Sequence, residues 1–237
     1  MILAAGRGER MRPLTDRCPK PLLEAGGKPL IVWHIERLRA AGITELVINH
    51  AHLGTMIEQA LGDGAHFGAS IRYSAEAVAL ETAGGIRQAL PLLGDAPFLV
   101  INGDIFCDVD LADLQASAAG VARGQDLAHL VLVANPPHHP EGDFHLDAAG
   151  RLAQSGSPRL TFSGVGIYSP ALFDGIPAGT RAPLGPHLRQ AMDAGRVGGQ
   201  RHDGLWLDIG TPERLAELDT RLRCAGDPVT GDNRQHP

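Results

Sequence analysis

Short apolar runs alternate with amphipathic segments over the first 135 residues of the chain. Runs rich in Ile, Leu, Val and Phe are typical of buried strands, and they lie at residues 1–4, 45–50, 69–74, 97–103 and 127–135. Between them, apolar positions recur at helical spacing with Pro or Gly near the ends, which predicts helices at residues 29–41, 53–61, 82–93 and 111–119. This alternation predicts an α/β fold, with a mostly parallel sheet covered by helices on both faces.

The pattern becomes less regular after residue 135. A turn-rich segment is followed by short strands around residues 159–169 and a helix over 183–195, and then by a strand, a turn and a last helix within 205–223. Residues 224–237 are polar and rich in Gly and Pro, so we expect a disordered tail. We therefore expect one domain over residues 1–223, formed by halves at 1–135 and 136–223; whether the native chain starts a few residues earlier stays open.

With 237 residues and a hydrophobic fraction of 43%, the chain is long enough to bury a sizeable core. A formal net charge of −6 argues against nucleic acid or an anionic membrane as its partner. The three cysteines are widely spaced, and no apolar run approaches the ~20 residues of a membrane span. Because no secretory signal pattern opens the chain either, we expect a reducing, cytoplasmic location.

Candidate chemistry follows the ends of the predicted strands, where ligands bind in parallel sheets. The loop after the first strand combines Gly6 and Gly8 with Arg10 and with Lys20, one of only two lysines in the chain. Glycines let backbone N–H groups approach a phosphate, and fixed cations stabilise its charge. The loop is not a Walker A motif, and Met11 stands where the dinucleotide fingerprint has its third glycine. The short G-x-G alone also fits a surface loop with solvated arginines.

The longer pattern of residues 3–21 is much more specific: L-A-A-G-x-G-x-R-M-x-P-L-T, followed by P-K-P. It resembles the N-terminal signature of the nucleotidyltransferases that make nucleotide sugars from sugar 1-phosphates. Three later segments resemble the family's motifs in the same order, namely LETAGG (80–85), INGD (101–104) and WLDIGTPE (206–213). Taken singly, they also fit a glycine-rich helix start, a turn aspartate and a Thr-Pro helix start. The resemblance implies the family's three-layer, Rossmann-like fold with a mostly parallel, mixed central sheet.

The resemblance also implies roles for individual residues. Arg10 and Lys20 are expected to be catalytic, because they stabilise the phosphates during transfer. Asp104 and Asp208 are expected to bind Mg²⁺, and Asp143 to contact the sugar. The nucleotide is expected to bind in the first half of the chain, at Leu3, Ala5, Gly6, Gly8, Glu9, Arg10, Lys20, Glu76, Gly84, Gly85 and Asn102.

Further segments, at residues 47–54, 61–64, 91–99, 138–144 and 160–173, resemble one branch of this family. That branch transfers a uridylyl group from UTP to N-acetylmuramate α-1-phosphate in peptidoglycan recycling, which implies UTP and this sugar 1-phosphate as partners. Alternatives inside the class are GTP or dTTP with a hexose 1-phosphate, and CTP with phosphocholine. A non-catalytic, regulatory sugar-nucleotide-binding protein is the alternative from another class, and it would be expected to lack Arg10, Lys20 or the aspartate pair.

The chain departs from the family pattern in its second half. Many relatives carry a Glu-Lys pair there whose lysine meets the sugar phosphate, but residues 147–163 contain no lysine. Arg151 and Arg159 are the candidate replacements. His138 and His139 lack a third ligand at metal spacing, so we interpret them as a loop pair. The hexapeptide repeats of bifunctional relatives are missing, which implies a transferase without an attached acetyltransferase.

Overall fold

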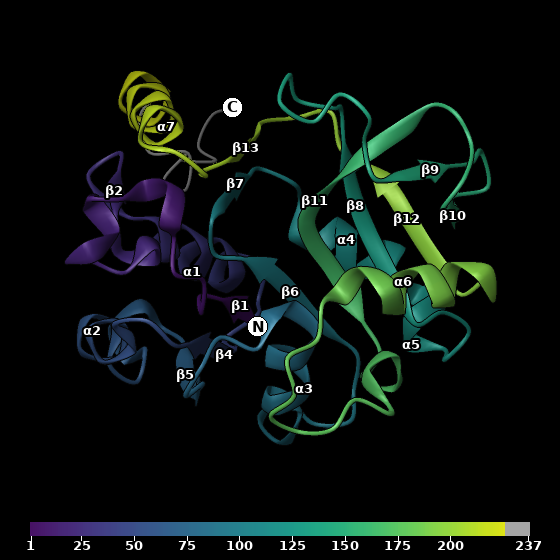
Figure 1. Cartoon of the computed structure of the whole chain (residues 1–237), viewed down its shortest axis with the longest axis horizontal. Coiled ribbons are helices and arrows are strands. Elements are labelled where there is room, and N and C mark those ends of the chain that lie inside the picture. The colour runs from purple at the N-terminus through teal and green to yellow at the C-terminus, as the bar shows by residue number, and fades with distance from the viewer. Residues whose placement is uncertain (226–237) are drawn as a thin grey trace, which may run out of the picture.

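The computed structural model describes residues 1–225, and a mixed, mostly parallel sheet forms its centre (Figure 1). The predicted tail lies outside the described residues from 226 onward, while residues 224 and 225 belong to the last helix. The sheet has the spatial order β5 (Ser70–Ala75), β4 (Glu45–His50), β1 (Ile2–Leu3), β6 (Phe98–Asn102), β11 (Arg159–Tyr168), β8 (Ala128–Val133) and β12 (Val197–Arg201).

The first four of these strands are parallel, as the alternating pattern predicted. Ile2 lies opposite both Ile48 of β4 and Ile101 of β6, so β1 is flanked on each side by a strand of the same direction. β11 runs antiparallel to β6 and β8 and makes the sheet mixed. The short strand β9 (Phe144–Leu146) pairs with the first residues of β11, and β10 (Leu152–Ala153) pairs with β9, which extends the sheet there.

The region around residues 159–169 forms one long strand rather than the short strands that we predicted. The pairing of β11 with β8 shifts between Phe162 and Gly166, which is a bulge, and Gly164 adopts φ +83° there. A bulge bends a strand without ending it, and glycine adopts this left-handed conformation without a Cβ penalty. Gly164 therefore marks a bend inside a continuous strand.

Helices cover both faces of the sheet and complete the three layers. On one face pack α1 (Leu30–Ala40), α2 (Gly54–Leu61) and α4 (Leu111–Ser117), followed by the short α5 (Ala119–Ala122); on the other pack α3 (Glu81–Leu93) and α6 (Leu184–Asp193). Alternate residues of β6 serve the two cores, since Ile101 packs with the first group and Val100 with the second. Within residues 1–225, no helix is long and apolar enough to cross a membrane.

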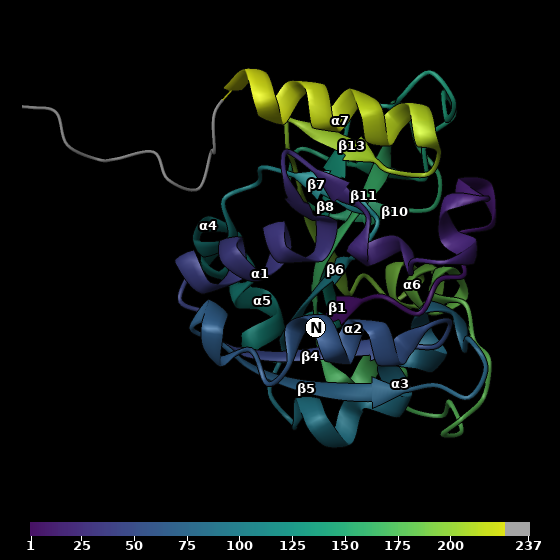
Figure 2. The ribbon, with the colours of Figure 1, turned by 90° about the vertical axis from the view of Figure 1, so that its left-hand side faces the viewer.

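A third apolar cluster joins the two ends of the chain. The last helix, α7 (Pro212–Ala225), lies across the top of the molecule next to β13 (Trp206–Asp208), as Figure 2 shows. It packs against the small β2 (Glu24–Ala25) and β3 (Lys28–Pro29) hairpin and against α1. The cluster contains Met11, Trp33, Phe106, Ile209, Leu218 and Leu222. It therefore holds the first loop, the strand β7 (Ile105–Cys107) and the C-terminal motif in one body.

Two neighbouring glycines in the β2–β3 turn can be substituted in turn to test how α7 packs on this hairpin. Gly26 and Gly27 both have positive φ, at +63° and +83°. A Cβ on Gly26 would lie 2.7 Å from the Leu222 Cβ and 2.9 Å from the Trp33 ring, whereas a Cβ on Gly27 would meet nothing within 4 Å.

We expect Gly26→Ala to lower the free energy of unfolding by about 2–4 kcal/mol, because backbone strain adds to overpacking under α7. Gly27→Ala carries the backbone strain alone, about 1 kcal/mol. Thermal unfolding of both variants checks the difference, at about 2–4 °C per kcal/mol for a chain of this size. Equal melting temperatures for the two variants would contradict this account of how α7 is anchored.

Candidate functional site

Two adjoining cavities open at the carboxyl ends of β1 and β6 and share Asn102 and Asp104 in their walls. The first, of about 440 Å³, is called the loop cavity, because the loop after β1 borders it. The second, of about 400 Å³, is called the histidine cavity, because His138 and His139 line it. Of the predicted residues, the loop cavity is lined by Leu3, Ala5, Gly6, Gly8, Glu9, Arg10, Lys20, Asn102 and Asp104, and the histidine cavity by Asn102, Asp104, Asp143 and Asp208.

The loop after β1 is shaped by its second glycine. Gly8 has φ +68° and ψ +40°, and a Cβ there would lie 2.9 Å from the Thr15 side chain. The Thr15 hydroxyl donates a hydrogen bond of 2.8 Å to the Gly8 carbonyl, and the Met11 N–H donates to the same oxygen. Because Met11 is fully buried in the third apolar cluster, the loop is fixed from below while its upper side faces the cavity.

Only part of the positive charge in this loop faces the loop cavity. Arg7 and Arg12 both pair with Asp16, at 2.9 Å, and the hydrogen bond from Arg7 is the main reason why the pKa of Asp16 is lowered. Arg10 and Lys20 line the cavity instead. The clustering of arginines in the sequence therefore serves two purposes, the bracing of the loop and the supply of two cations to the cleft.

Lys20 links the first motif to the end of β6. Its side chain is 8% exposed, and its Nζ donates a 2.8 Å hydrogen bond to Oδ2 of Asp104, whose side chain is half exposed. A buried ammonium group requires such a partner. The Lys20 amine therefore lies beside Asp104, a carboxylate that lines both cavities.

Glu76, Gly84 and Gly85 lie outside both cavity walls. Glu76 is 5% exposed, and its two carboxylate oxygens accept hydrogen bonds from the Asn49 side chain (2.6 Å) and the Leu80 N–H (2.8 Å). A Cβ on Gly85 would lie 2.6 Å from a Glu76 oxygen, and a Cβ on Gly84 would lie 2.3 Å from the Thr180 carbonyl. These residues hold the start of α3 in place, whereas Ala79, Glu81, Thr82 and Arg181 line the cavity.

Asn49 is a cavity residue that the sequence reasoning missed. It is the penultimate residue of β4, lies in the loop-cavity wall, and accepts a 3.0 Å hydrogen bond from the Ala4 N–H. Asn49 and Asn102 both lie opposite Leu3, one on each side of β1. The same four letters, LVIN, lie at or next to the end of both neighbouring strands, at residues 46–49 and 99–102, and this repeat was the available signal.

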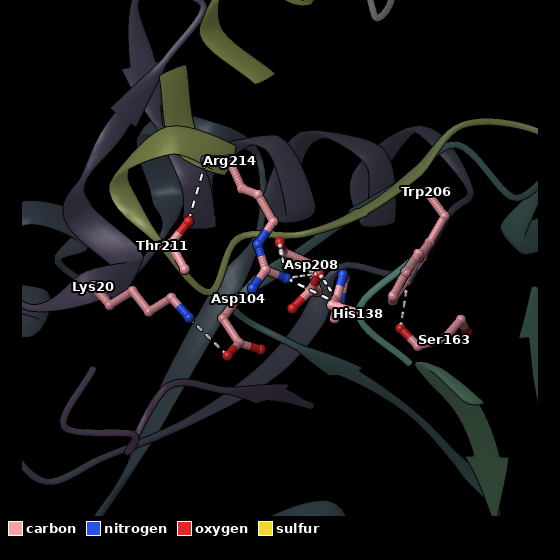
Figure 3. A network of polar contacts seen from close by, with 8 residues as sticks. All are labelled: Lys20, Asp104, His138, Ser163, Trp206, Asp208, Thr211 and Arg214. Carbon is pink, nitrogen blue, oxygen red and sulfur yellow. Dashed lines mark hydrogen bonds and ion pairs between the residues drawn. The ribbon is translucent and has the colours of Figure 1, made fainter. Parts of the chain in front are cut away.

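Asp208 reaches the histidine cavity through strand pairing. β13 pairs antiparallel with β7, so Asp208 lies opposite Ile105, and the Ile209 N–H donates to the Asp104 carbonyl at 2.7 Å. Figure 3 shows the two aspartates beside each other, although they are far apart in the sequence. The pairing places both carboxylates in the wall of one cavity.

Each of these aspartates has a cationic or titratable neighbour (Figure 3). Arg214 donates to the Asp208 carboxylate and to its carbonyl, and His138 Nε2 lies 3.1 Å from the same carboxylate oxygen. Arg214 also contacts His138, with 3.2 Å between the nitrogens. His138 and His139 lie in a loop, as we interpreted them, and the structure adds that His138 faces the carboxylate of Asp208. Arg214 was missed, although it directly follows the WLDIGTPE motif.

Asp143 lies in the histidine cavity with its carboxylate already oriented. One oxygen accepts the Phe162 N–H at 2.8 Å, and the other lies 3.2 Å from Nε2 of His139. The two candidates for the missing lysine lie elsewhere. Arg151 makes a two-pronged contact with Asp126, and Arg159 donates to the Asp143 carbonyl; neither lines the cavity.

The donor set suits a hard divalent cation shared with a ligand. Within residues 1–225, no three His, Cys, Asp or Glu side chains gather as a complete protein cage. Mg²⁺ does not need one, because it is bound by one or two carboxylates together with phosphate oxygens and waters. Asp104 and Asp208 supply two such carboxylates in one wall, so these residues fit the expected ion.

A buried histidine supports the strand that follows Asp104. His34 of α1 is 2% exposed, hydrogen-bonds the backbone of Ile105, and keeps its Nε2 without a partner among the described residues. Burial lowers the pKa of His34 to about 4. The side chain is therefore neutral at pH 7 and contributes no charge beneath the cleft.

Comparison with known proteins identifies the class of protein to which this fold and cleft belong. The family profile described as nucleotidyl transferase matches residues 1–223. The chain belongs to this family and is a nucleotidyltransferase.

Particular relatives are similar over almost their full length. The N-acetylmuramate alpha-1-phosphate uridylyltransferase of Neisseria meningitidis serogroup B is 60% identical over 92% of this chain and 95% of that protein. The protein of the same name from Caulobacter vibrioides is 37% identical over 94% of this chain and 96% of that protein. A crystal structure of HddC from Yersinia pseudotuberculosis complexed with GMP-PN has the same fold, with a TM-score of 0.76 over 93% of this chain and 97% of that one at 20% identity.

The neutral His34 predicts a pH dependence of stability. An unfolded histidine takes up a proton near pH 6.5, whereas folded His34 stays neutral down to about pH 4. The stability that His34 contributes is therefore complete above pH 6.5 and is lost as the pH falls from 6.5 toward 4. Between pH 7 and pH 5 we expect a loss of about 2 kcal/mol, from 1.36 kcal/mol per pH unit.

Urea unfolding of the wild type and of His34→Gln at pH 7, 6 and 5 isolates this group, since other titrations are common to both. We expect the variant to be less stable at pH 7 but to lose less stability on acidification. Parallel pH profiles of the two proteins would show that folding does not lower the pKa of His34.

Proposed function

We propose that this nucleotidyltransferase transfers a uridylyl group from UTP to N-acetylmuramate α-1-phosphate, giving UDP-N-acetylmuramate and pyrophosphate in peptidoglycan recycling. The main support for this proposal is the 60% identity, over almost the whole of both chains, to a protein named for this reaction. The connected cleft supports the proposal, since the loop cavity has the glycines and cations that a triphosphate requires. We propose the cytoplasm as its location, because the nucleotide substrate is found there.

In the proposed reaction, an oxygen of the sugar phosphate forms a bond with the α-phosphorus of UTP. The bond from that phosphorus to the β-phosphate oxygen breaks, and pyrophosphate leaves. No protein nucleophile is needed, because the attacking phosphate is already ionised at pH 7. The protein must align two anions that repel each other and stabilise the charge that shifts to the leaving group.

The roles of the chain's own residues follow from their places in the cleft. Backbone groups at Gly8 and Glu9, together with Arg10, bind the β- and γ-phosphates and stabilise the leaving group. Lys20, beside Asp104, reduces the repulsion between the α-phosphate and the acceptor phosphate. Asp143, fixed by Phe162, is positioned to accept a sugar hydroxyl.

Asp104 and Asp208 are the residues that would hold Mg²⁺, which when bound supplies Lewis-acid stabilisation of phosphate oxygens and a template for their alignment. Before the substrates bind, Lys20 and Arg214 compensate these two carboxylates. A non-catalytic binding protein has no need of this arrangement, so the site supports an enzyme.

A panel of nucleotides against sugar 1-phosphates tests the proposal. We expect pyrophosphate release to be fastest for UTP with N-acetylmuramate α-1-phosphate, by about tenfold or more in kcat/KM over GTP, dTTP or CTP and over hexose 1-phosphates or phosphocholine. A faster alternative pair would change the substrate assignment. Binding of nucleotide sugars without pyrophosphate release from any pair would indicate the regulatory alternative.

The two lysines of the chain form a matched pair of variants. We expect Lys20→Ala to lower kcat by about 10²–10³-fold, because a preorganised cation at the reacting phosphates is lost. Lys28 pairs with Glu36 at 2.7 Å and lies outside both cavity walls, so Lys28→Ala should keep kcat near the wild-type value. Steady-state kinetics with circular dichroism of both variants checks this. Near-normal turnover by a folded Lys20→Ala protein would remove Lys20 from the mechanism.

A further inference from the structure

Among the described residues, no lysine or arginine lines the histidine cavity, although the proposed reaction brings a phosphate there. The acidic residues of this cavity wall are Asp104, Asp143 and Asp208. A sugar 1-phosphate brings up to two more negative charges to this wall. A phosphate dianion beside three carboxylates needs a strong hydrogen-bond donor of positive charge.

Arg214 is the best candidate for this positively charged donor. Its side chain is 19% exposed and extends from the first turn of α7 toward Asp208 and His138, both of which line the histidine cavity. Figure 3 shows the guanidinium between the helix and these two residues. One of its amino groups, Nη1, makes all three contacts with Asp208 and His138.

The second amino group of Arg214, Nη2, lies near Gly210 in the wall of the loop cavity, while Nη1 is held by residues of the histidine cavity. A Cβ placed on Gly210 would lie 3.2 Å from Nη2 of Arg214 and 3.0 Å from Nη2 of Arg10. Gly210 itself lines the loop cavity. The two guanidinium groups therefore approach Gly210 together, and only a residue without a side chain leaves this space open. Two cations that meet beside one cavity wall are well placed to receive an anion.

The other cations of the region already have different tasks. Lys20 binds Asp104, Arg151 binds Asp126, and Arg159 binds the backbone of Asp143. Arg214 and Lys20 both pair with a carboxylate that is proposed to bind the divalent ion. Lys20 lines the loop cavity, however, whereas Asp208 and His138, the side-chain partners of Arg214, both line the histidine cavity. The hydrogen-bond donors of Arg214 are thus the ones that can be released toward the histidine cavity.

We propose that Arg214 binds the phosphate of the sugar 1-phosphate and takes the place of the lysine that is missing from the second half of the chain. In the free protein its guanidinium is held by Asp208, and on acceptor binding it exchanges that carboxylate for the phosphate. This proposal rests on the proposed function, since it concerns the acceptor of the same reaction. It adds that acceptor binding and the release of Asp208 are coupled.

The test measures binding rather than turnover. Isothermal titration calorimetry in magnesium-free buffer with EDTA gives dissociation constants for N-acetylmuramate 1-phosphate, for unphosphorylated N-acetylmuramate and for UTP. We expect Arg214→Gln to weaken the sugar 1-phosphate about tenfold or more, as for the loss of a charge-assisted hydrogen bond. The unphosphorylated sugar and UTP should bind as they do to the wild type. Arg214→Lys should restore part of the lost affinity, since it keeps the charge but not the planar fork.

Two further variants separate this role from a structural one. Arg221→Gln removes an exposed arginine of the same helix that pairs with Glu217, and it should leave all three dissociation constants unchanged. Asp208→Asn removes the competing carboxylate charge, so in the absence of metal it should tighten sugar 1-phosphate binding about threefold or more. A structural role for Arg214 predicts weaker binding in both Asp208→Asn and Arg214→Gln.

The outcomes also separate this inference from the proposed function. If the wild type binds a different sugar 1-phosphate, the substrate assignment fails, but the same variants test Arg214 with that ligand. If Arg214→Gln, folded by circular dichroism, binds the sugar 1-phosphate like the wild type, the role of Arg214 is overturned alone. If UTP and the sugar 1-phosphate weaken equally, Arg214 serves the nucleotide and the inference is also overturned. If the wild type binds no sugar 1-phosphate, both proposals fall.

Discussion

The cleft depends on the compensation of charge between two aspartates and two cations. Asp104 and Asp208 lie in the wall of one cavity, and each is paired in the described structure, with Lys20 and Arg214 respectively. Carboxylates at such proximity repel each other unless a cation lies between or beside them. In the proposed reaction, both carboxylates and both cations would exchange these partners for a divalent ion and for phosphates.

This compensation relies on packing that lies far from the charges. β7 and β13 pair through three residues each, and α7 follows directly, so the positions of Asp208 and Arg214 depend on how α7 is seated. The third apolar cluster seats it, with Trp33 and Phe106 in edge-to-face contact at 6.0 Å between ring centres. Met11 of the first loop belongs to the same cluster. One patch of apolar side chains therefore aligns the first and the last motif of the chain.

The buried polar network beneath the loop cavity has a different function from the cavity wall. Glu76, Gly84 and Gly85 are predicted to meet the nucleotide, and in the structure they lie outside both cavity walls, around the start of α3. The Glu76 carboxylate is already hydrogen-bonded within the protein, so it supports the residues next to the cavity. Motif matching alone does not distinguish a residue that touches a ligand from one that orients such a residue.

The sequence by itself was enough to predict the alternating strands and helices, the parallel core, the glycine loop with Arg10 and Lys20, and the family, because these depend on local periodicity and on motifs of fixed spacing. Only the tertiary structure decided four other features. These are the bend inside β11, the binding of Arg151 and Arg159 to partners outside the cavity, the contact of His138 with Asp208, and the position of Arg214. Each of these depends on residues that are distant along the chain, and on which partner a charged side chain can reach once the sheet and α7 are packed. Spacing in the sequence carries no information about that reach.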